Sequence, residues 1–372
     1  MKFRAEHQEF AAAIGWVTRI VGARVTLPAL SGVLLEAGEG RVTCRATDLE
    51  VAAEVSIPAQ VSEPGRALLP GRLLAQLVAR LPAAAVEVGG GVDGVEVTCG
   101  RSNFHVRGMP ADDFPQLPEP DADATPGSIK ATAFSRLVSQ VARAAATDEA
   151  RPALTGVKLS SSGDSLGATA TDAYRLATRS VPWETSIEAE ALVPSRALSE
   201  AAKAASDAGG SLEVILEPGQ ATFRFGDRRL TTQLIEGKTI DAEALLPQDF
   251  EATATIERAP LMEALQRVAI VAQGRANSPV KLVFEDDSVD LQVNNQEVGD
   301  ASEALQVELV GDPLTIRFNP EFLRQGLDAL ASEQVEIQMN GELKPAVLRA
   351  HSDPDDDGPV DDFRYLLMPM RP

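Results

Sequence analysis

The feature that most constrains the fold of this chain is a long internal repeat. Three motifs of the first third recur in the middle third, each displaced by 124 residues. The pairs are Pro28-Ala-Leu-Ser-Gly-Val33 with Pro152-Ala-Leu-Thr-Gly-Val157, Ala46-Thr-Asp48 with Ala170-Thr-Asp172, and Leu68-Leu-Pro-Gly-Arg-Leu-Leu74 with Leu192-Val-Pro-Ser-Arg-Ala-Leu198. A fainter third copy has a helical face at Leu261, Leu265 and Val268, and Phe318-Asn-Pro320 before a second helix. A repeat of this length indicates duplicated domains rather than a solenoid.

The repeat predicts three domains, at residues 1–120, 127–249 and 250–372. A chain of 372 residues is too long for one ordinary core, and residues 119–127 have the composition of a linker. Periodicity in each copy indicates two helices and roughly eight short strands. Two amphipathic helices can cover only one face of so many strands. The predicted fold class is therefore α+β, with two helices packed inside curved antiparallel sheets in each domain.

The segment 151–177 is the centre of this prediction. Residues 156–170 alternate apolar and polar side chains on both sides of a predicted Ser-Ser-Ser-Gly turn at 160–163, which is typical of a hairpin. An apolar cluster that includes one arginine lies in the same segment. Its members are Leu154, Tyr174, Arg175 and Leu176. No catalytic partner for this cluster is evident, so binding is the more natural role.

We expect a cytoplasmic protein. No apolar run approaches the roughly 20 residues that span a bilayer, and the N-terminus is charged and amphipathic, unlike a signal peptide. Cys44 and Cys99 are the only cysteines. A disulfide between them is one alternative, but two buried free thiols fit a cytosolic protein better.

The net charge of −21 argues against nucleic acid, unless the charge is segregated. The six helix windows 6–24, 71–81, 132–146, 195–207, 257–275 and 320–331 together carry four more basic than acidic residues. The acid therefore lies on strands and loops, above all at 353–362. The predicted DNA-facing residues are Arg24, Arg72, Arg80, Arg136, Arg143, Arg151, Arg196, Lys203 and Arg267. An ordinary solvated surface is the alternative for any single helix; the shared pattern favours loose contact with duplex phosphates.

The sequence proposes no enzyme, no metal site and no cofactor. Its three histidines have no ligand-like spacing. Glu236-Gly-Lys-Thr239 ends like a phosphate loop, but Thr232 stands where the first glycine is required. Asp48 and Asp172 occupy equivalent repeat positions, which favours a structural turn over a catalytic pair.

The closing motif completes a family resemblance. Tyr365-Leu-Leu-Met-Pro-Met-Arg371, with Thr26-Leu-Pro-Ala-Leu-Ser-Gly32, Ala170-Thr-Asp-Ala-Tyr-Arg-Leu176 and Phe318-Asn-Pro320, resembles the bacterial sliding clamp, the beta subunit of DNA polymerase III, in its actinobacterial form. The resemblance covers the whole chain. It implies a processivity factor of DNA replication, in which two subunits join head to tail into a six-domain ring around duplex DNA.

The resemblance also implies a peptide-binding cleft between domains 2 and 3. DNA polymerase III, clamp loader subunits and other proteins with a clamp-binding motif would dock there through a short Leu/Phe peptide. Carried over position by position, the cleft residues are Leu154, Thr171, Tyr174, Arg175, Leu176, Pro247, Phe322, Leu366, Met368, Pro369, Met370 and Arg371. Taken singly, any apolar member is more often plain core, and only the set as a whole favours a site.

The implied homodimer interface joins domain 1 of one subunit to domain 3 of the other. It would pair Phe104 and Val106 with Ile270 and Val271. Arg101 would face the acidic run that contains Glu297, Asp300 and Glu303.

The chain departs from the family pattern at Ala173, Thr239-Ile240 and Pro372. These positions fall near the implied cleft, so they bear on its peptide preference. The main interpretation is a DNA sliding clamp. The alternative is a diverged paralogue with an altered cleft, for example one resistant to a clamp-directed inhibitor.

Overall fold

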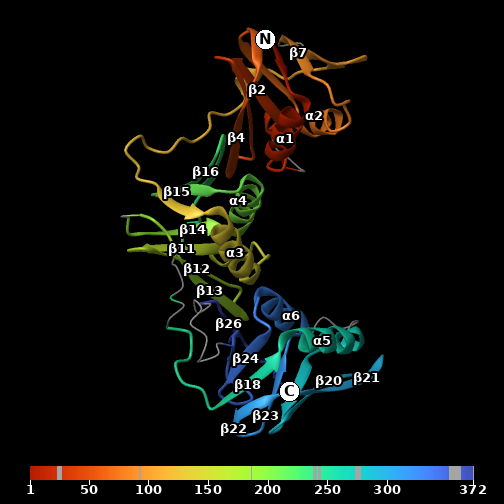
Figure 1. Ribbon diagram of the computed structural model, residues 1–372, viewed down its shortest axis with the longest axis vertical. Helices are drawn as coiled ribbons and strands as arrows, with labels where there is room; N and C mark the ends of the chain where they lie inside the picture. The colour runs from red at the N-terminus through yellow and green to blue at the C-terminus, as the bar shows by residue number, and fades with distance from the viewer. Residues whose placement is uncertain are drawn as a thin grey trace. The chain divides into compact units, whose positions relative to one another are not determined.

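The computed structural model describes residues 1–22, 27–91, 94–185, 187–237, 241, 244–272, 278–351 and 362–371. Arg24, Thr239-Ile240 and Pro372 lie outside these residues. The described part of the chain forms two compact units (Figure 1). Unit 1 comprises residues 1–132, 184–187 and 200–234, and unit 2 comprises residues 133–183, 188–199 and 235–372. The second copy of the repeat is thus divided between the two units.

Each copy of the repeat supplies two α-helices to the described structure, as the periodicity predicted. The first copy contains β1 (Lys2–Ala5), α1 (His7–Val17), η1 (Pro28–Ser31), β2 (Gly32–Gly38), β3 (Arg41–Thr47), β4 (Val51–Pro58), β5 (Gln60–Glu63), β6 (Gly65–Pro70), α2 (Gly71–Val78), β7 (Val86–Gly91), β8 (Gly94–Cys99), β9 (Ser102–Val106) and η2 (Ala111–Asp113). The second contains β10 (Gly127–Lys130), α3 (Ala131–Val141), η3 (Ala142–Ala144), η4 (Pro152–Leu154), β11 (Gly156–Ser162), β12 (Ser165–Thr171), β13 (Arg175–Pro182), β14 (Ala189–Pro194), α4 (Ser195–Ala208), β15 (Ser211–Glu217), β16 (Gln220–Phe225) and β17 (Arg228–Gln233).

The third copy repeats the same order of helices and strands. It contains β18 (Ala252–Glu257), α5 (Arg258–Ala272), β19 (Val280–Phe284), β20 (Ser288–Asn295), β21 (Gly299–Gln306), β22 (Glu308–Gly311), β23 (Leu314–Phe318), α6 (Pro320–Ala329), β24 (Gln334–Met339), β25 (Ala346–Ala350) and β26 (Arg364–Leu367). In the second copy, the hairpin turn predicted at 160–163 is shorter than expected, because β11 continues through Ser162.

Unit 1 is built on two antiparallel sheets. One has the strand order β10-β15-β16-β17-β4-β3-β2-β6, and the other has the order β5-β1-β7-β8-β9. Helix α1 packs on β3, β4 and α2, and its Phe10 meets Phe3 edge-on, with 5.8 Å between ring centroids. The first sheet crosses from one copy of the repeat to the next, because β4 pairs with β17.

Unit 2 has the same design. Its larger sheet has the order β14-β11-β12-β13-β26-β25-β24-β18-β22, and its smaller sheet has the order β21-β20-β19-β23. Strand β13 of the second copy pairs with β26 of the third, with Leu176 opposite Leu366. Helix α5 packs on α6 and β20, and α6 packs on β26. Both units therefore place helices against antiparallel sheets, which confirms the predicted fold class.

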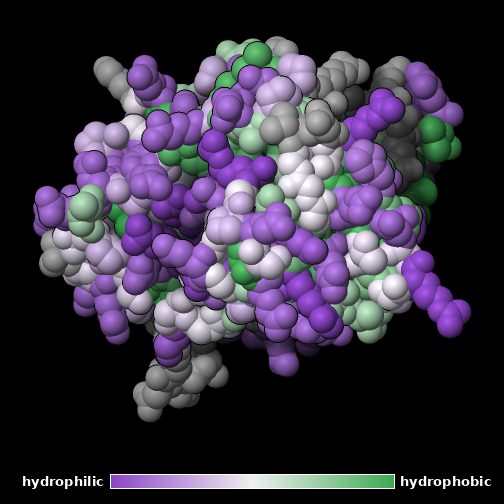
Figure 2. Space-filling view, turned by 90° about the horizontal axis from the view of Figure 1, so that it is seen from above, coloured by the Kyte–Doolittle hydropathy of each residue, from purple (hydrophilic) through white to green (hydrophobic). Residues whose placement is uncertain are grey.

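The remaining sequence predictions concern thiols and surface. Cys44 and Cys99 are buried and free, as predicted, and burial raises the pKa of the Cys44 thiol to about 12. None of the described helices is long and apolar enough to cross a membrane. On the face drawn in Figure 2, hydrophilic side chains predominate and hydrophobic ones lie in small separate patches.

We expect Gly326→Ala to destabilise unit 2, because a Cβ at residue 326 would lie 2.7 Å from the ring of Tyr365. Overpacking of this kind costs about 1–3 kcal/mol. The matched control is Gly15→Ala in α1, where a Cβ meets nothing within 4 Å and the higher helix propensity of alanine contributes up to about 1 kcal/mol. Denaturant midpoints measure both. Equal midpoints for the two variants would contradict the close packing of α6 on β26.

Candidate functional site

The candidate site begins at the turn Thr171–Arg175, which connects β12 to β13. Thr171 Oγ1 donates to the carbonyl of Arg175 (2.6 Å), and Asp172 Oδ1 accepts from the backbone N–H groups of Tyr174 (2.9 Å) and Arg175 (3.0 Å). Ala173 between them has a φ of 76°, a left-handed conformation that favours glycine. The turn therefore holds a strained backbone in place with side-chain hydrogen bonds.

The same turn occurs 124 residues earlier, between β3 and β4. Thr47 Oγ1 donates to the carbonyl of Val51 (2.9 Å), Asp48 Oδ1 accepts from the N–H groups of Glu50 and Val51, and Leu49 has a φ of 79°. Both aspartates thus bind the backbone of their own turn. The structural role predicted for them is confirmed.

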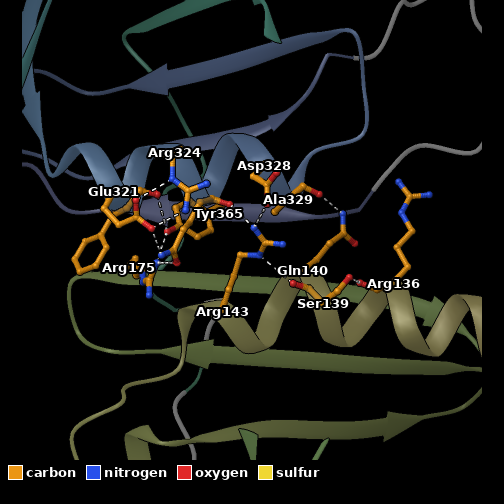
Figure 3. A network of polar contacts seen from close by, with 12 residues as sticks. Arg136, Ser139, Gln140, Arg143, Arg175, Glu321, Arg324, Asp328, Ala329 and Tyr365 are labelled. Atoms are coloured by element: carbon orange, nitrogen blue, oxygen red, sulfur yellow. Dashed lines mark hydrogen bonds and ion pairs between the residues drawn. The ribbon is translucent and has the colours of Figure 1, made fainter. Parts of the chain in front are cut away.

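Arg175 stands in the second turn where Val51 stands in the first. Arg175 is only 7% exposed. Nε donates to Asp172 Oδ2 (3.0 Å), Nη1 donates to Gln325 Oε1 (2.5 Å) and to the Tyr365 hydroxyl (3.3 Å), and the guanidinium lies 4.3 Å from the centroid of the Phe322 ring. Figure 3 shows this group between β13 and α6. Nε and Nη1 therefore serve the protein itself, whereas the sequence had suggested that Arg175 binds a peptide.

Tyr365 connects the same group to the backbone of α6. Its hydroxyl donates to the carbonyl of Phe322 (3.0 Å), and burial raises the pKa of the phenol to about 12. At physiological pH the hydroxyl is protonated, so it can donate one hydrogen bond while accepting another from Arg175.

An apolar cluster lies beside this polar group. Leu176, Leu246, Val347 and Leu366 are buried together, and the partly buried Phe250 packs against them. Leu176 and Leu366 were predicted from the sequence, and the other three were not. Leu246 is next to the predicted Pro247. Val347 reaches the cluster through the pairing of β25 with β26, and no motif in the sequence around it indicates that contact.

Two exposed apolar side chains adjoin the cluster. The N–H of Met368 donates to the carbonyl of Tyr174 (2.9 Å), and Tyr174 is 61% exposed and Met368 40% exposed. The structure thus brings together seven of the predicted cleft residues. They are Thr171, Tyr174, Arg175, Leu176, Phe322, Leu366 and Met368.

The other predicted cleft residues are less constrained. Leu154, Pro247, Pro369 and Met370 are partly buried, and Arg371 is exposed. The N–H of Met370 donates to the carbonyl of Arg317 (2.7 Å), which fixes the path of the chain after β26. Their role in a site stays a prediction.

The predicted DNA-facing residues in the described part of the chain differ in their partners. Most are exposed side chains, as expected: Arg72, Arg80, Arg136, Arg151, Arg196, Lys203 and Arg267. Three form ion pairs that the sequence did not indicate, and one of these joins Lys203 to Glu200 (2.9 Å). Arg143 binds Asp328 (2.9 Å), and Arg267 binds Glu303 (2.5 Å) and Glu263 (3.5 Å).

The predicted interface residues lie on or near two edge strands, β9 in unit 1 and β21 in unit 2. Phe104 is 42% exposed and Ile270 is 63% exposed. Val106 is buried within unit 1 at 3% exposure, and its part in an interface stays a prediction. The carbonyl of the partly buried Val271 accepts from Asn295 Nδ2 (3.2 Å).

The acidic interface residues are also placed by the structure. Glu297 and Asp300 are exposed. Glu303, expected to face Arg101, is held by Arg267 of its own chain, and this hydrogen bond lowers its pKa. Two residues predicted for different surfaces, Glu303 and Arg267, are therefore neighbours.

Comparison with known proteins assigns the whole chain. Family models of the DNA polymerase III beta subunit match residues 1–118 (N-terminal domain), 128–241 (central domain) and 243–371 (C-terminal domain). The chain therefore belongs to the DNA polymerase III beta-subunit family, the bacterial sliding clamps. This is a family of non-catalytic processivity factors of DNA replication.

The individual similarities span the full chain. A beta sliding clamp of Streptomyces coelicolor is 38% identical over 100% of this chain and 99% of its own length. The beta sliding clamp homolog GriR of Streptomyces muensis is 34% identical with the same coverage. The clamp structure of Bacillus subtilis superimposes with a TM-score of 0.93 at 25% identity, covering 100% of this chain and 99% of the other. The Pseudomonas aeruginosa clamp bound to griselimycin has a TM-score of 0.91 at 28% identity and the same coverage.

We expect Asp172→Ala to destabilise the protein far more than Asp48→Ala. Removing Asp172 leaves the buried Arg175 without its carboxylate, which costs about 3–5 kcal/mol. In the first turn Val51 stands where Arg175 stands in the second. Asp48→Ala therefore removes hydrogen bonds to the backbone, which costs about 1 kcal/mol. Denaturant unfolding of the two variants measures the difference. Similar losses would show that the ion pair of Arg175 adds little to the turn.

Proposed function

We propose that the protein encircles duplex DNA as a head-to-tail homodimer and tethers DNA polymerase III, clamp loader subunits and other proteins by a short Leu/Phe peptide. The observation that carries this proposal is the apolar cluster of Leu176, Leu246, Val347 and Leu366, with Tyr174 and Met368 exposed beside it. We call this cluster, its two exposed neighbours and residues 369–371 the candidate peptide site. The protein would act in the cytoplasm, without catalysis and without a cofactor.

The chemistry of the candidate peptide site suits an extended apolar peptide. Methionine and leucine side chains adapt to varied apolar partners, and each fully buried Leu or Phe anchor contributes roughly 1.5–3 kcal/mol. Arg371 is exposed and can donate to peptide carbonyls or carboxylates. A micromolar complex needs about −8 kcal/mol, which two or three such anchors supply after ordering costs.

Exposed basic side chains on and beside the helices support contact with DNA. Arg72, Arg136 and Arg196 are exposed on α2, α3 and α4, while the chain as a whole carries a net charge of −21. Cations on helices attract duplex phosphates without recognising the base sequence, and acidic residues on the strands and loops repel the phosphates. We therefore expect duplex DNA to bind weakly, and in a salt-dependent way, to the inside of the ring.

Two open strand edges support the homodimer. β9 ends one sheet of unit 1 and β21 ends one sheet of unit 2, and an edge strand presents unpaired backbone groups to another strand. Arg101 and Arg107 lie beside β9, and Asp300 and Glu303 lie on β21. Opposite charge favours pairing of β9 with β21 of a second copy, and a head-to-tail contact of this kind closes into a ring or grows into a filament.

The double variant Phe104→Ala with Ile270→Ala should shift the dimer to monomer. Both side chains are exposed in the single chain, and each truncation removes apolar area that the proposed interface would bury. Light scattering measures the mass. In a loading assay on nicked circular DNA, the original protein should stay on circles and leave after they are cut, and the double variant should not be retained. Arg4→Ala is the control, since Arg4 forms an exposed ion pair with Glu87. A wild-type monomer at micromolar concentration would contradict the ring.

Deleting residues 368–372 should abolish binding of a Leu/Phe peptide while the dimer persists, because the deletion removes Met368 and Arg371 but neither β9 nor β21. Fluorescence anisotropy of a labelled peptide measures the affinity. A truncated protein that binds the peptide at near-original affinity would show that the site lies elsewhere.

A diverged paralogue with an altered peptide site is the second candidate function. It is favoured by Ala173, a departure from the family pattern that has a φ of 76° and directly precedes the exposed Tyr174, and by the 34% identity to the clamp homolog GriR. The 38% identity to the Streptomyces coelicolor clamp favours the main proposal. Titration with griselimycin separates the two, since tight binding would argue against an altered, resistant site.

A further inference from the structure

Helix α6 receives hydrogen bonds from α3 and η3 at its C-terminal end. Gln140 Nε2 donates to the carbonyl of Ala329 (2.7 Å), and Arg143 Nη1 donates to the carbonyl of Gln325 (2.9 Å) (Figure 3). The last four carbonyls of a helix, here including that of Ala329, have no partner within the helix, and a cation near the C-terminal end is favoured by the helix dipole. The second copy of the repeat thus caps a helix of the third.

Arg143 makes three contacts in this arrangement. Nε donates to the carbonyl of Ser139 (2.9 Å), and Nη1 donates both to Gln325 and to Asp328 Oδ2 (2.9 Å). Its side chain is 22% exposed. Acceptors at fixed positions on two elements match the planar fork of a guanidinium, and the single ammonium of lysine cannot reproduce them.

Gln325 connects this end of α6 to the candidate peptide site. Its backbone carbonyl accepts from Arg143, while its side chain accepts from Arg175 (2.5 Å) and donates to Glu321 Oε1 (2.6 Å). The next residue, Gly326, packs against the ring of Tyr365 on β26, the strand that leads to Met368. The polar contacts therefore hold α6 at both ends, with Arg175 and Tyr365 near its start and Arg143 and Gln140 near its end.

We propose that Arg143 is a positioning residue of the candidate peptide site and not a DNA contact. By fixing the C-terminal half of α6, it keeps Gln325 in reach of Arg175 and keeps β26 against β13, so that the site is formed before a peptide arrives. Nε and Nη1 are engaged by Ser139, Gln325 and Asp328, and the Asp328 carboxylate offsets the charge that a phosphate would meet. The inference rests on the proposed function of the site.

Arg136 offers a matched comparison on α3, the helix that directly precedes η3. It lies seven residues before Arg143, on the face that the sequence assigned to DNA, and its side chain is exposed. Substituting the two arginines in the full-length dimer separates a phosphate contact from a positioning contact, because each role changes a different measurement.

The variants are Arg143→Ala, Arg143→Lys and Arg136→Ala. Arg143→Ala and Arg143→Lys should each weaken binding of a labelled Leu/Phe peptide about fivefold, and Arg136→Ala should leave it unchanged. Conversely, Arg136→Ala should lower the salt dependence of duplex binding by about one phosphate contact, and Arg143→Ala should not. Lysine retains the charge, so unchanged peptide affinity in Arg143→Lys would overturn the proposal, as would a reduced salt dependence in Arg143→Ala.

Amide hydrogen exchange without peptide provides the second measurement. Both Arg143 variants should speed exchange at Leu330, whose N–H binds the carbonyl of Leu327 in α6, and at Met368, whose N–H binds Tyr174. A merely structural role would instead speed exchange throughout unit 2, and unchanged exchange at both amides would also overturn the proposal. If the wild-type protein binds no Leu/Phe peptide, the proposed function fails, while the exchange result still decides whether Arg143 positions α6. Asp328→Ala, at an exposed carboxylate, replaces the Arg143 variants if they do not fold and should show the same local change.

Discussion

The structure depends on backbone pairing that crosses the boundaries of the repeat. Strand β4 of the first copy binds β17 of the second, and β13 of the second binds β26 of the third. Each copy therefore leaves an open edge that the next copy fills, which removes an exposed edge strand. The second of these pairings places Arg175 opposite Leu367 and Leu176 opposite Leu366, residues nearly 200 positions apart, and the candidate peptide site follows from that register.

The two junctions are alike in backbone and different in chemistry. The N–H of Gln233 binds the carbonyl of Glu50 at the first junction, as the N–H of Met368 binds that of Tyr174 at the second. The first junction has Glu50 and Val51 where the second has Tyr174 and Arg175. The duplicated turn therefore continues the sheet at the first junction. At the second junction it also carries an apolar surface with a buried arginine.

Arginine has two roles in this acidic chain. Exposed arginines on the helices can attract phosphates over a distance, and surface ion pairs such as Arg267 with Glu263 contribute little to stability. Arg175, which is buried, and Arg143 instead bind acceptors at fixed positions. In such positions an arginine orients the elements that it joins, and its charge is largely compensated by Asp172 or Asp328.

Much of this protein was predictable from local sequence. The 124-residue offset indicated the duplicated domains, because repeated motifs fold into repeated elements, and apolar periodicity located α1 to α6. Asp48 and Asp172 were correctly interpreted as turn residues, since a side chain that binds its own backbone needs no distant partner. The motifs at 170–176 and 365–371 indicated the two halves of the candidate peptide site through their family resemblance, and that site stays a prediction.

Only the tertiary structure decided which long-range partners each side chain has. Val347 joined the apolar cluster through the order of strands, Leu246 joined it from the segment before β18, Arg267 met Glu303, and Val106 was buried within unit 1. Arg143 and Arg136 share a helical face in the sequence pattern, yet Arg143 binds Gln325 and Asp328 of α6. Periodicity reports which face of an element a residue occupies, whereas the packing of distant elements determines what that face meets.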